Sequence, residues 1–185
     1  MRIGFIIFWI LALISLVIFL ILRPEFLHPE FLAEKIRENR FSSSVIYFLL
    51  IIILGFFIIP NSPVVLAGAL VLGDDLFSLI ILTMSAIILT ATLIYYFSRF
   101  LNIEEFLHRK YAKQYIYIQE KLNKYGFFII SGWSFLPLVS TDIMCYACGV
   151  MRIPIGKFLI ALTIGETIRI CLYVFTASGV VGWLF

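Results

Sequence analysis

Three ionisable side chains lie within apolar runs of this 185-residue chain, and they are the first candidates for chemistry. Asp142 interrupts the run at residues 126–149, GFFIISGWSFLPLVSTDIMCYACG, while Glu166 and Arg169 stand one helical turn apart in the run at 158–183. An ionised group in hydrocarbon is costly unless it finds a partner or water. Such residues therefore indicate a transport path, a ligand site or a buried network.

Arg169 is the candidate counter-charge for Asp142. Alternatively, Glu166 neutralises Arg169, and Asp142 faces water or a lipid headgroup. A third alternative is a buried network of all three that only fixes the packing, because unpaired charge is expensive there. The sequence leaves the three arrangements open.

Other reactive residues form no catalytic pattern. Cys145 and Cys148 have the spacing of a redox pair, but they lie in an apolar stretch, where small packing residues are the better interpretation. The two histidines, His28 and His108, lie in separate polar segments. We therefore expect no enzyme, no metal site and no cofactor.

The composition places these residues in an all-α polytopic membrane protein. Hydrophobic residues make up 63% of the chain and charged residues 14%, and the mean hydropathy is +1.09. The formal charge of +3 comes from clustered loops, which suit an anionic lipid leaflet and give no indication of nucleic-acid binding.

The chain order predicts an N-terminal part, residues 1–44, and a membrane domain, residues 45–185. Each part combines apolar runs of spanning length with amphipathic segments expected to lie at the membrane interface. The expected spanning segments are 3–22, 45–59, 77–97 and 158–183, and the expected interfacial helices are 24–40 and 103–125.

Residues 127–150 are predicted to form a re-entrant helical hairpin. Pro137, Ser140, Thr141 and Asp142 interrupt the apolar run, and non-helical backbone at membrane depth requires a protein or water lining. The chain would enter along 127–135, turn at 137–142 and return along 143–150.

A second interruption, Pro60-Asn61-Ser62-Pro63, divides the apolar run at residues 44–73. We expect a spanning helix over 45–59 followed by a re-entrant piece over 60–73 that includes Gly68 and Gly73. The alternative is one long tilted helix with a proline kink. Breaks in both halves of the chain favour an inverted repeat, with the two tips meeting near the midplane.

Charge placement orients this topology. With both hairpins returning to their side of entry, all basic residues except Arg2 and Arg169 share one face, while Asp74 and Asp75 lie opposite. The positive-inside rule makes the basic face cytoplasmic and both termini external, although Arg2 alone would favour an internal N-terminus.

The order of these residues resembles a known membrane family. Pro137, Asp142, Tyr146 and Gly149, followed by Phe158 and Gly165, are similar to the core signature of the DedA, or SNARE-associated VTT, family. The first half is similar as well, and the resemblance covers about residues 45–182. The matching positions there are Pro60, Pro63, Ala67, Gly68, Gly73, Tyr95 or Tyr96, Ser98 and Arg99.

The resemblance implies two facing re-entrant hairpins and a multi-pass protein of a prokaryotic cell membrane. It also implies phospholipid scrambling or translocation of polyprenyl-phosphate carriers, in some members with proton coupling. This chain departs from the family pattern, because Ser134 stands where an arginine is common, residues 54–59 hold no acid, and Ser85 and Thr90 replace two glycines. Arg169 could replace the missing arginine as the phosphate contact.

The expected mechanism is a thin polar groove in which a headgroup slides while its acyl tails stay in lipid. The expected groove residues are Asn61, Ser134, Pro137, Thr141, Asp142, Glu166 and Arg169, and the expected hairpin residues are Pro60, Pro63, Gly68, Gly73, Tyr146 and Gly149. Membrane lipids are the expected partner, and a homo-oligomer is left open. An ion- or proton-coupled transporter and a non-transporting membrane-assembly or homeostasis protein are the alternatives.

Overall fold

The computed structural model describes residues 40–72, 75–101, 110–136 and 139–184, together with residue 104 and eight positions between 11 and 28. Within these ranges every regular element is a helix, in agreement with the predicted all-α class. The predicted N-terminal anchor and surface helix fall largely outside the described residues, as do Gly73 and Pro137.

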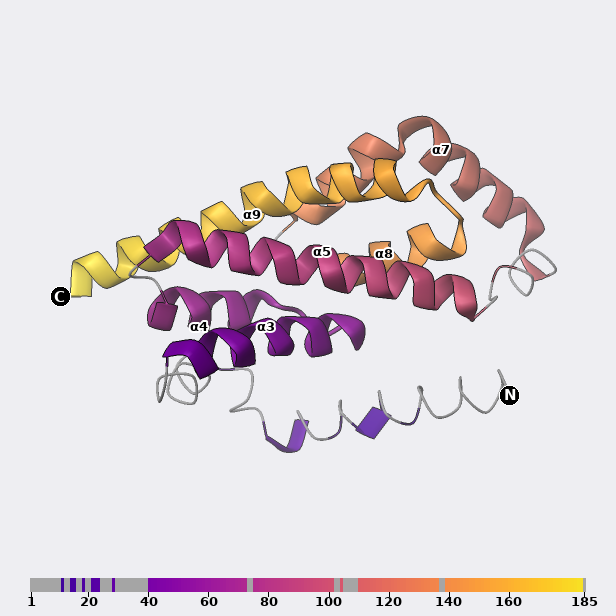
Figure 1. Cartoon of the computed structure of the whole chain (residues 1–185). Helices are drawn as coiled ribbons and strands as arrows, with labels where there is room; N and C mark the ends of the chain where they lie inside the picture. Colours follow the sequence, from indigo (N-terminus) through magenta and orange to yellow (C-terminus); the bar gives the residue numbers. More distant parts are fainter. Residues whose placement is uncertain are drawn as a thin grey trace.

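Two long helices, α5 (Leu76–Phe100) and α9 (Ile155–Leu184), form the axis of the molecule (Figure 1). Their segments Leu76–Phe100 and Ile155–Thr176 are long and apolar enough to cross a membrane. They run antiparallel, since the Tyr95 and Phe158 rings stack with centroids 5.7 Å apart near one end. The Thr167 hydroxyl contacts Met84 Sδ at 3.8 Å farther along both helices.

The first half forms a helical hairpin from α3 (Arg40–Phe56) and α4 (Ser62–Leu72). Gly68 of α4 lies so close to the Tyr47 ring of α3 that an added Cβ would come within 2.4 Å of it. The chain therefore reverses direction between these residues, which rules out the alternative of one kinked helix. The piece predicted over 60–73 corresponds to α4, which lies antiparallel to α3.

Backbone hydrogen bonds close the end of α3. Ile59 N donates to Leu54 O and Ile58 N donates to Gly55 O, both at 2.9 Å, which is the Schellman pattern. Ile58 occupies the left-handed position with φ 62°, where glycine is usual and a β-branched residue is strained.

The second half repeats the hairpin with α7 (Ala112–Phe135) and α8 (Thr141–Val150). Trp133 Nε1 donates to Ser140 O at 3.3 Å near the turn, and Gln119 Nε2 donates to Met151 O at 3.3 Å at the open end. Residues 112–125 of the predicted amphipathic segment and the entering arm are thus one continuous helix. The arms extend over the predicted hairpin range, 127–150, with a longer first arm.

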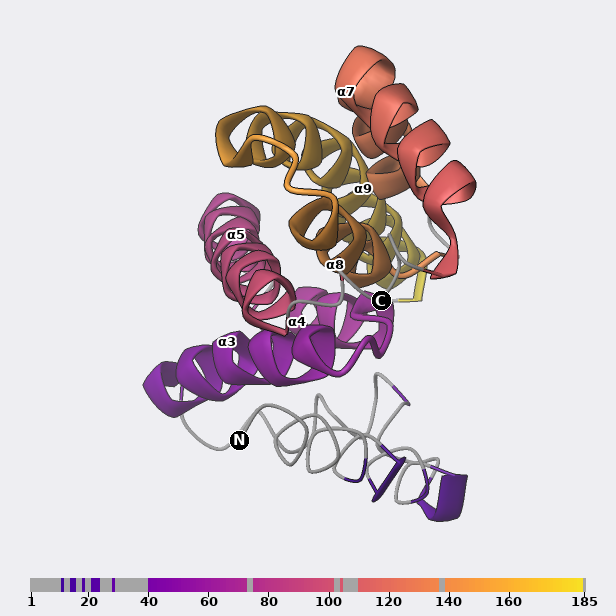
Figure 2. The same cartoon turned by 90° about the vertical axis from the view of Figure 1, so that its right-hand side faces the viewer.

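The two hairpins approach the axis from opposite ends (Figure 1). In the view turned by 90°, α3 and α7 lie on opposite sides of the molecule (Figure 2). Helix α8 packs on the C-terminal half of α5, where a Cβ on Gly149 would lie 2.5 Å from the Tyr95 carbonyl oxygen. Helix α4 packs on the C-terminal half of α9, where Ser62 and Tyr173 join their hydroxyls at 3.1 Å. Because α5 and α9 are antiparallel, α4 and α8 lead away from each other and their N-termini meet in the middle.

Candidate functional site

A small cavity lies where the N-termini of α4 and α8 meet α9. It is lined from the first hairpin by Pro60, Asn61 and Ser62, from the second by Val139, Ser140, Thr141, Asp142 and Cys145, and from the long helices by Ile87, Ala91, Leu162, Glu166 and Arg169. Its volume is about 20 Å³. One water molecule needs roughly 10–15 Å³ by this measure, so the cavity has room for about one water.

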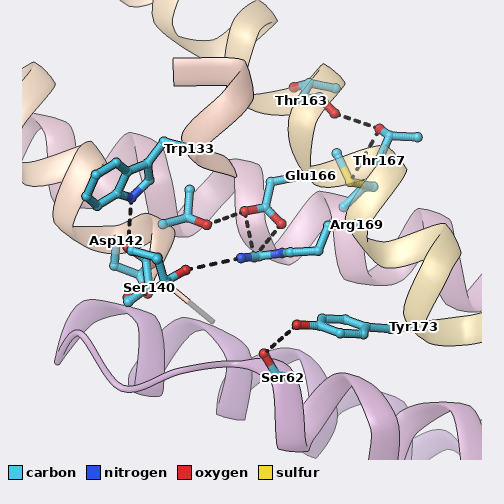
Figure 3. Close-up of polar contacts among 12 residues, drawn as sticks. Ser62, Trp133, Ser140, Asp142, Thr163, Glu166, Thr167, Arg169 and Tyr173 are labelled. Carbon is cyan, nitrogen blue, oxygen red and sulfur yellow. Dashed lines mark hydrogen bonds and ion pairs between the residues drawn. The ribbon is translucent and has the colours of Figure 1, made fainter. Parts of the chain in front are cut away.

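An ion pair within α9 forms one wall of the cavity (Figure 3). Arg169 Nη2 donates to both carboxylate oxygens of Glu166 at 2.6 Å, and the two side chains face each other because they are three residues apart on one helix. Glu166 is fully buried and Arg169 is 8% exposed. The two buried charges compensate each other, so loss of either side chain would leave the other charge buried and unpaired.

Thr141 connects this ion pair to the second hairpin. Its hydroxyl donates to Glu166 Oε1 at 2.6 Å, and the Arg169 Nη1 contacts Val139 O at 3.5 Å. Hydrogen bonds to charged groups are among the stronger ones in proteins. The tip of the α7–α8 hairpin is therefore fastened to the charged face of α9.

Asp142 is buried at the same site without a counter-charge of its own. It is 7% exposed, and its Oδ2 accepts a 2.9 Å hydrogen bond from the neutral Ser140 hydroxyl. In the described part of the chain it forms no ion pair. Its position in the first turn of α8 places the carboxylate near the positive end of the helix dipole, which partly compensates the charge. Of the three arrangements considered, the structure has Glu166 pairing with Arg169.

Three buried polar atoms lack a hydrogen-bond partner among the described residues: Asn61 Oδ1, Arg169 Nε and Ser134 Oγ. Such atoms are rare in folded proteins and call for a water, an ion or a ligand. Asn61 and Arg169 both line the cavity, Asn61 from the first hairpin and Arg169 from α9.

The structure brings together most, but not all, of the predicted groove residues. Asn61, Thr141, Asp142, Glu166 and Arg169 line the cavity. Ser134 does not, because it is buried at the contact between α7 and α9, where a Cβ on Gly165 would lie 2.7 Å from its Cβ. An arginine side chain at position 134 would therefore start from a crowded helix contact. Pro137 lies outside the described residues.

The predicted hairpin residues fall at helix starts and helix contacts. Pro60 lines the cavity, Pro63 is the second residue of α4, and Gly68 and Gly149 allow the close approaches described above. The Tyr146 hydroxyl donates to Phe56 O at 2.7 Å, which links α8 to the end of α3.

Tyr173 is the residue that sequence reasoning missed. It joins Ser62 across the helix contact, so both hairpin tips are attached to α9 (Figure 3). A signal was present, since positions 166, 169 and 173 recur at three and four residues and so share one helix face. No group of three metal-ligating side chains occurs among the residues that the structure describes.

Two helices of this protein are long and apolar enough to cross a membrane, and the cavity beside them is lined by buried charged side chains. Both features are typical of a helical membrane protein. The sequence profile of the VTT domain matches residues 59–179. The chain therefore belongs to the VTT domain family, the DedA or SNARE-associated membrane proteins. Among curated proteins and among solved structures, no significant match is found.

Proposed function

We propose that this protein moves lipid headgroups across the bilayer between its two hairpin tips. The observation that carries the proposal is the meeting of the α4 and α8 N-termini at a buried cavity that holds Asp142, Glu166 and Arg169. Helices that begin inside a membrane protein and point their N-termini at a polar site are a recurrent substrate-binding arrangement in transporters. Phospholipid and polyprenyl-phosphate headgroups are the candidate cargo.

In this proposal each hairpin is re-entrant and α5 and α9 are the spanning helices. The α4 and α8 arms have 11 and 10 residues, which is about half the length that a span of the hydrocarbon core needs. Two half-length arms that start at one cavity and extend to opposite ends of α5 and α9 support a position of that cavity near the bilayer midplane. In this topology the basic residues of 99–124 and 152–157 lie on the cytoplasmic face, and the membrane is the cell membrane of a prokaryote.

A cavity that holds about one water cannot contain a lipid headgroup, so this conformation is the occluded one. Opening requires the hairpin tips to move from α9. The contacts to be broken are Ser62 with Tyr173 on one side and Thr141 with Glu166 on the other. When they part, the freed hydroxyls and charges replace part of the headgroup hydration, which lowers the cost of crossing.

A second candidate function is transport of a proton or small cation. Two buried carboxylates, Asp142 and Glu166, face a cavity of water size, and chains of buried acids serve as proton paths in membrane transporters. This function needs no opening wide enough for a headgroup.

Scrambling in liposomes tests the proposal. The purified protein is reconstituted with fluorescent phospholipid, an impermeant quencher is added, and the wild type is compared with Asp142→Ala. Asp75→Ala is the matched control, because Asp75 caps α5 away from the cavity by accepting a hydrogen bond from Ser78 N. We expect quenching beyond the outer-leaflet fraction for the wild type and Asp75→Ala, and a slower rate for Asp142→Ala.

Quenching that stops at the outer leaflet for phospholipid and for a labelled polyprenyl phosphate would contradict lipid movement. A proton flux in the same liposomes, abolished by Asp142→Ala, would then favour the second candidate. Equal lipid rates for wild type and a folded Asp142→Ala would show that the cavity is not the path.

A further inference from the structure

The N-terminal half of α7 carries a face of lysines and tyrosines. Its members are exposed and follow one another at three or four residues: Lys113, Tyr117, Lys121 and Lys124. This spacing places them on one side of the helix. Tyr125 lies at the edge of the same side and is 43% exposed. The face therefore points away from the protein core.

The lysines of this face contact aromatic rings. Lys121 Nζ lies 5.5 Å from the centroid of the Tyr117 ring, and Lys124 Nζ lies 5.1 Å from that of the Tyr125 ring. A ring attracts an ammonium group without neutralising its charge. Helix α7 contains three lysines against one acid, Glu120, and none of the three forms an ion pair within the described residues. The face therefore keeps a positive charge for a partner.

Farther along α7 the same face becomes apolar. Phe128 follows Lys124 by four residues and is 76% exposed, and Phe135, seven residues later, is 41% exposed. Steps of four and seven residues stay on one side of a helix, so these rings continue the face of the lysines. In a membrane protein, exposed apolar side chains suit the hydrocarbon core and exposed lysines and tyrosines suit the headgroup layer. The change between Lys124 and Phe128 therefore indicates the border between the two layers.

Two contacts fix the level of this face in the molecule. Gln119 Nε2 donates to Met151 O at 3.3 Å. Lys157 Nζ donates to Asn123 O at 2.6 Å. Both contacts lie where α5 and α8 end and α9 begins (Figure 1). The basic face is therefore at one end of the long apolar helices, the level at which lipid phosphates lie.

We propose that residues 113–125 form a docking surface for anionic phospholipids of the leaflet at this end, with lysine ammonium groups donating to the lipid phosphates. A net negative headgroup is favoured over a zwitterionic one, because a headgroup ammonium repels the lysines. A lipid is favoured over a soluble anion, because the face continues directly into an apolar one. An open hollow of about 420 Å³ provides room on this surface and is lined by Lys113, Gln114, Tyr117 and Ile118.

The docking surface lies on the outside of α7 and does not include the cavity between the hairpin tips. The inference therefore requires a membrane setting but no movement of lipid across the bilayer. Its failure would leave the proposed function in place, and failure of the proposed function would leave it in place.

Lipid binding to the full-length protein in detergent tests the inference. Phosphatidylglycerol and phosphatidylcholine with identical acyl chains are titrated, and native mass spectrometry counts the lipids bound. We expect the wild type to prefer phosphatidylglycerol. Lys121→Gln should lower the affinity for phosphatidylglycerol about fivefold, and replacement of all three lysines by glutamine should lower it about 100-fold. The affinity for phosphatidylcholine should stay the same in both variants.

Lys157→Gln is the matched control. It removes one lysine at the same end of the molecule, whose ammonium group already donates to Asn123 O, and we expect it to keep the preference. The melting temperature of each variant checks that it is folded. Equal losses for Lys157→Gln and Lys121→Gln would overturn the inference, because net charge would then be the cause. A wild type without preference, or a preference that survives in the folded triple variant, would overturn it too.

Two soluble competitors separate lipid from other anions. sn-Glycerol 3-phosphate carries the phosphate without acyl chains, and polyglutamate represents an acidic protein surface. We expect neither to displace phosphatidylglycerol at equal concentration. Displacement by the first would indicate a site for free phosphate, displacement by the second a site for an acidic protein, and either result would overturn the docking of lipid.

Discussion

The Thr141 hydroxyl donates a 2.6 Å hydrogen bond to Glu166 Oε1, the same carboxylate that receives Arg169 Nη2. One carboxylate thus holds both the counter-charge within α9 and the tip of the second hairpin. The stability of the cavity and the position of the tip depend on the same buried group. The first two predictions follow from that shared dependence.

Glu166→Gln leaves the Arg169 guanidinium buried without a counter-charge. We expect a loss of about 3–5 kcal/mol in unfolding free energy, because breaking a buried pair exposes the full desolvation cost of the remaining ion. Glu166→Gln combined with Arg169→Met removes both charges and should recover a large part of that loss. Denaturation in detergent measures both variants, and a double variant no more stable than Glu166→Gln would contradict the pairing as the cause.

Thr141→Val keeps the shape of the side chain and removes the hydroxyl that reaches Glu166. We expect a loss of about 1.5–3 kcal/mol, since a buried hydrogen bond to a charged group disappears. Thr176→Val is the matched control, because the exposed Thr176 hydroxyl donates to Leu172 O of its own helix at 2.6 Å. Thermal unfolding of the two variants should differ clearly. Equal losses would argue against a special role for the tip contact.

Gly149→Ala tests the close contact between α8 and α5. The new Cβ would lie 1.9 Å from Ser98 Oγ and 2.5 Å from the Tyr95 carbonyl oxygen, so the helices must separate. We expect a loss of about 1–3 kcal/mol from overpacking. Gly132→Ala serves as the control, because a Cβ there meets nothing within 4 Å and should raise stability by up to about 1 kcal/mol through helix propensity. The same sign for both variants would contradict the contact.

Ile58→Gly removes a β-branched side chain from a left-handed backbone position with φ 62°. We expect a gain of about 1 kcal/mol in unfolding free energy, because glycine adopts this conformation without the Cβ clash. Ile58→Ala, which keeps a Cβ, is the control and should not gain. Thermal unfolding checks the pair. A loss of stability for Ile58→Gly would mean that the packing of this side chain outweighs the backbone strain.

Much of the architecture was accessible from local sequence signals. Apolar runs of spanning length at residues 77–97 and 158–183 became α5 and α9 with small extensions, since burial in lipid or protein requires such runs. The breaks predicted at 60–63 and 137–142 overlap the two places where the chain turns, between Phe56 and Ser62 and between Phe135 and Thr141. Proline and small polar residues end helices through local backbone chemistry, so these signals do not depend on the rest of the fold.

The contents of the cavity required the tertiary structure. A spacing of three residues on one helix makes the Glu166 to Arg169 pair sterically available, but whether Arg169 turns to Glu166 or to Asp142 depends on where α8 packs against α9. The packing of α7 on α9 places Ser134 against Gly165 and outside the cavity. The packing of α4 on α9 brings Tyr173 to Ser62, 111 positions away in the sequence.

The sequence by itself therefore determined the membrane class, the helix breaks and the identity of the buried charges, because each follows from composition or from neighbouring residues. Only the tertiary structure decided the partners of those charges and the water-sized volume between them. The reason is physical: a change of a few tenths of an ångström in the distance between two helices makes or breaks a hydrogen bond and opens or closes a cavity. These interhelical distances are set by tertiary contacts, such as that of Gly149 with Tyr95. Such contacts cannot be read from the order of residues along the chain.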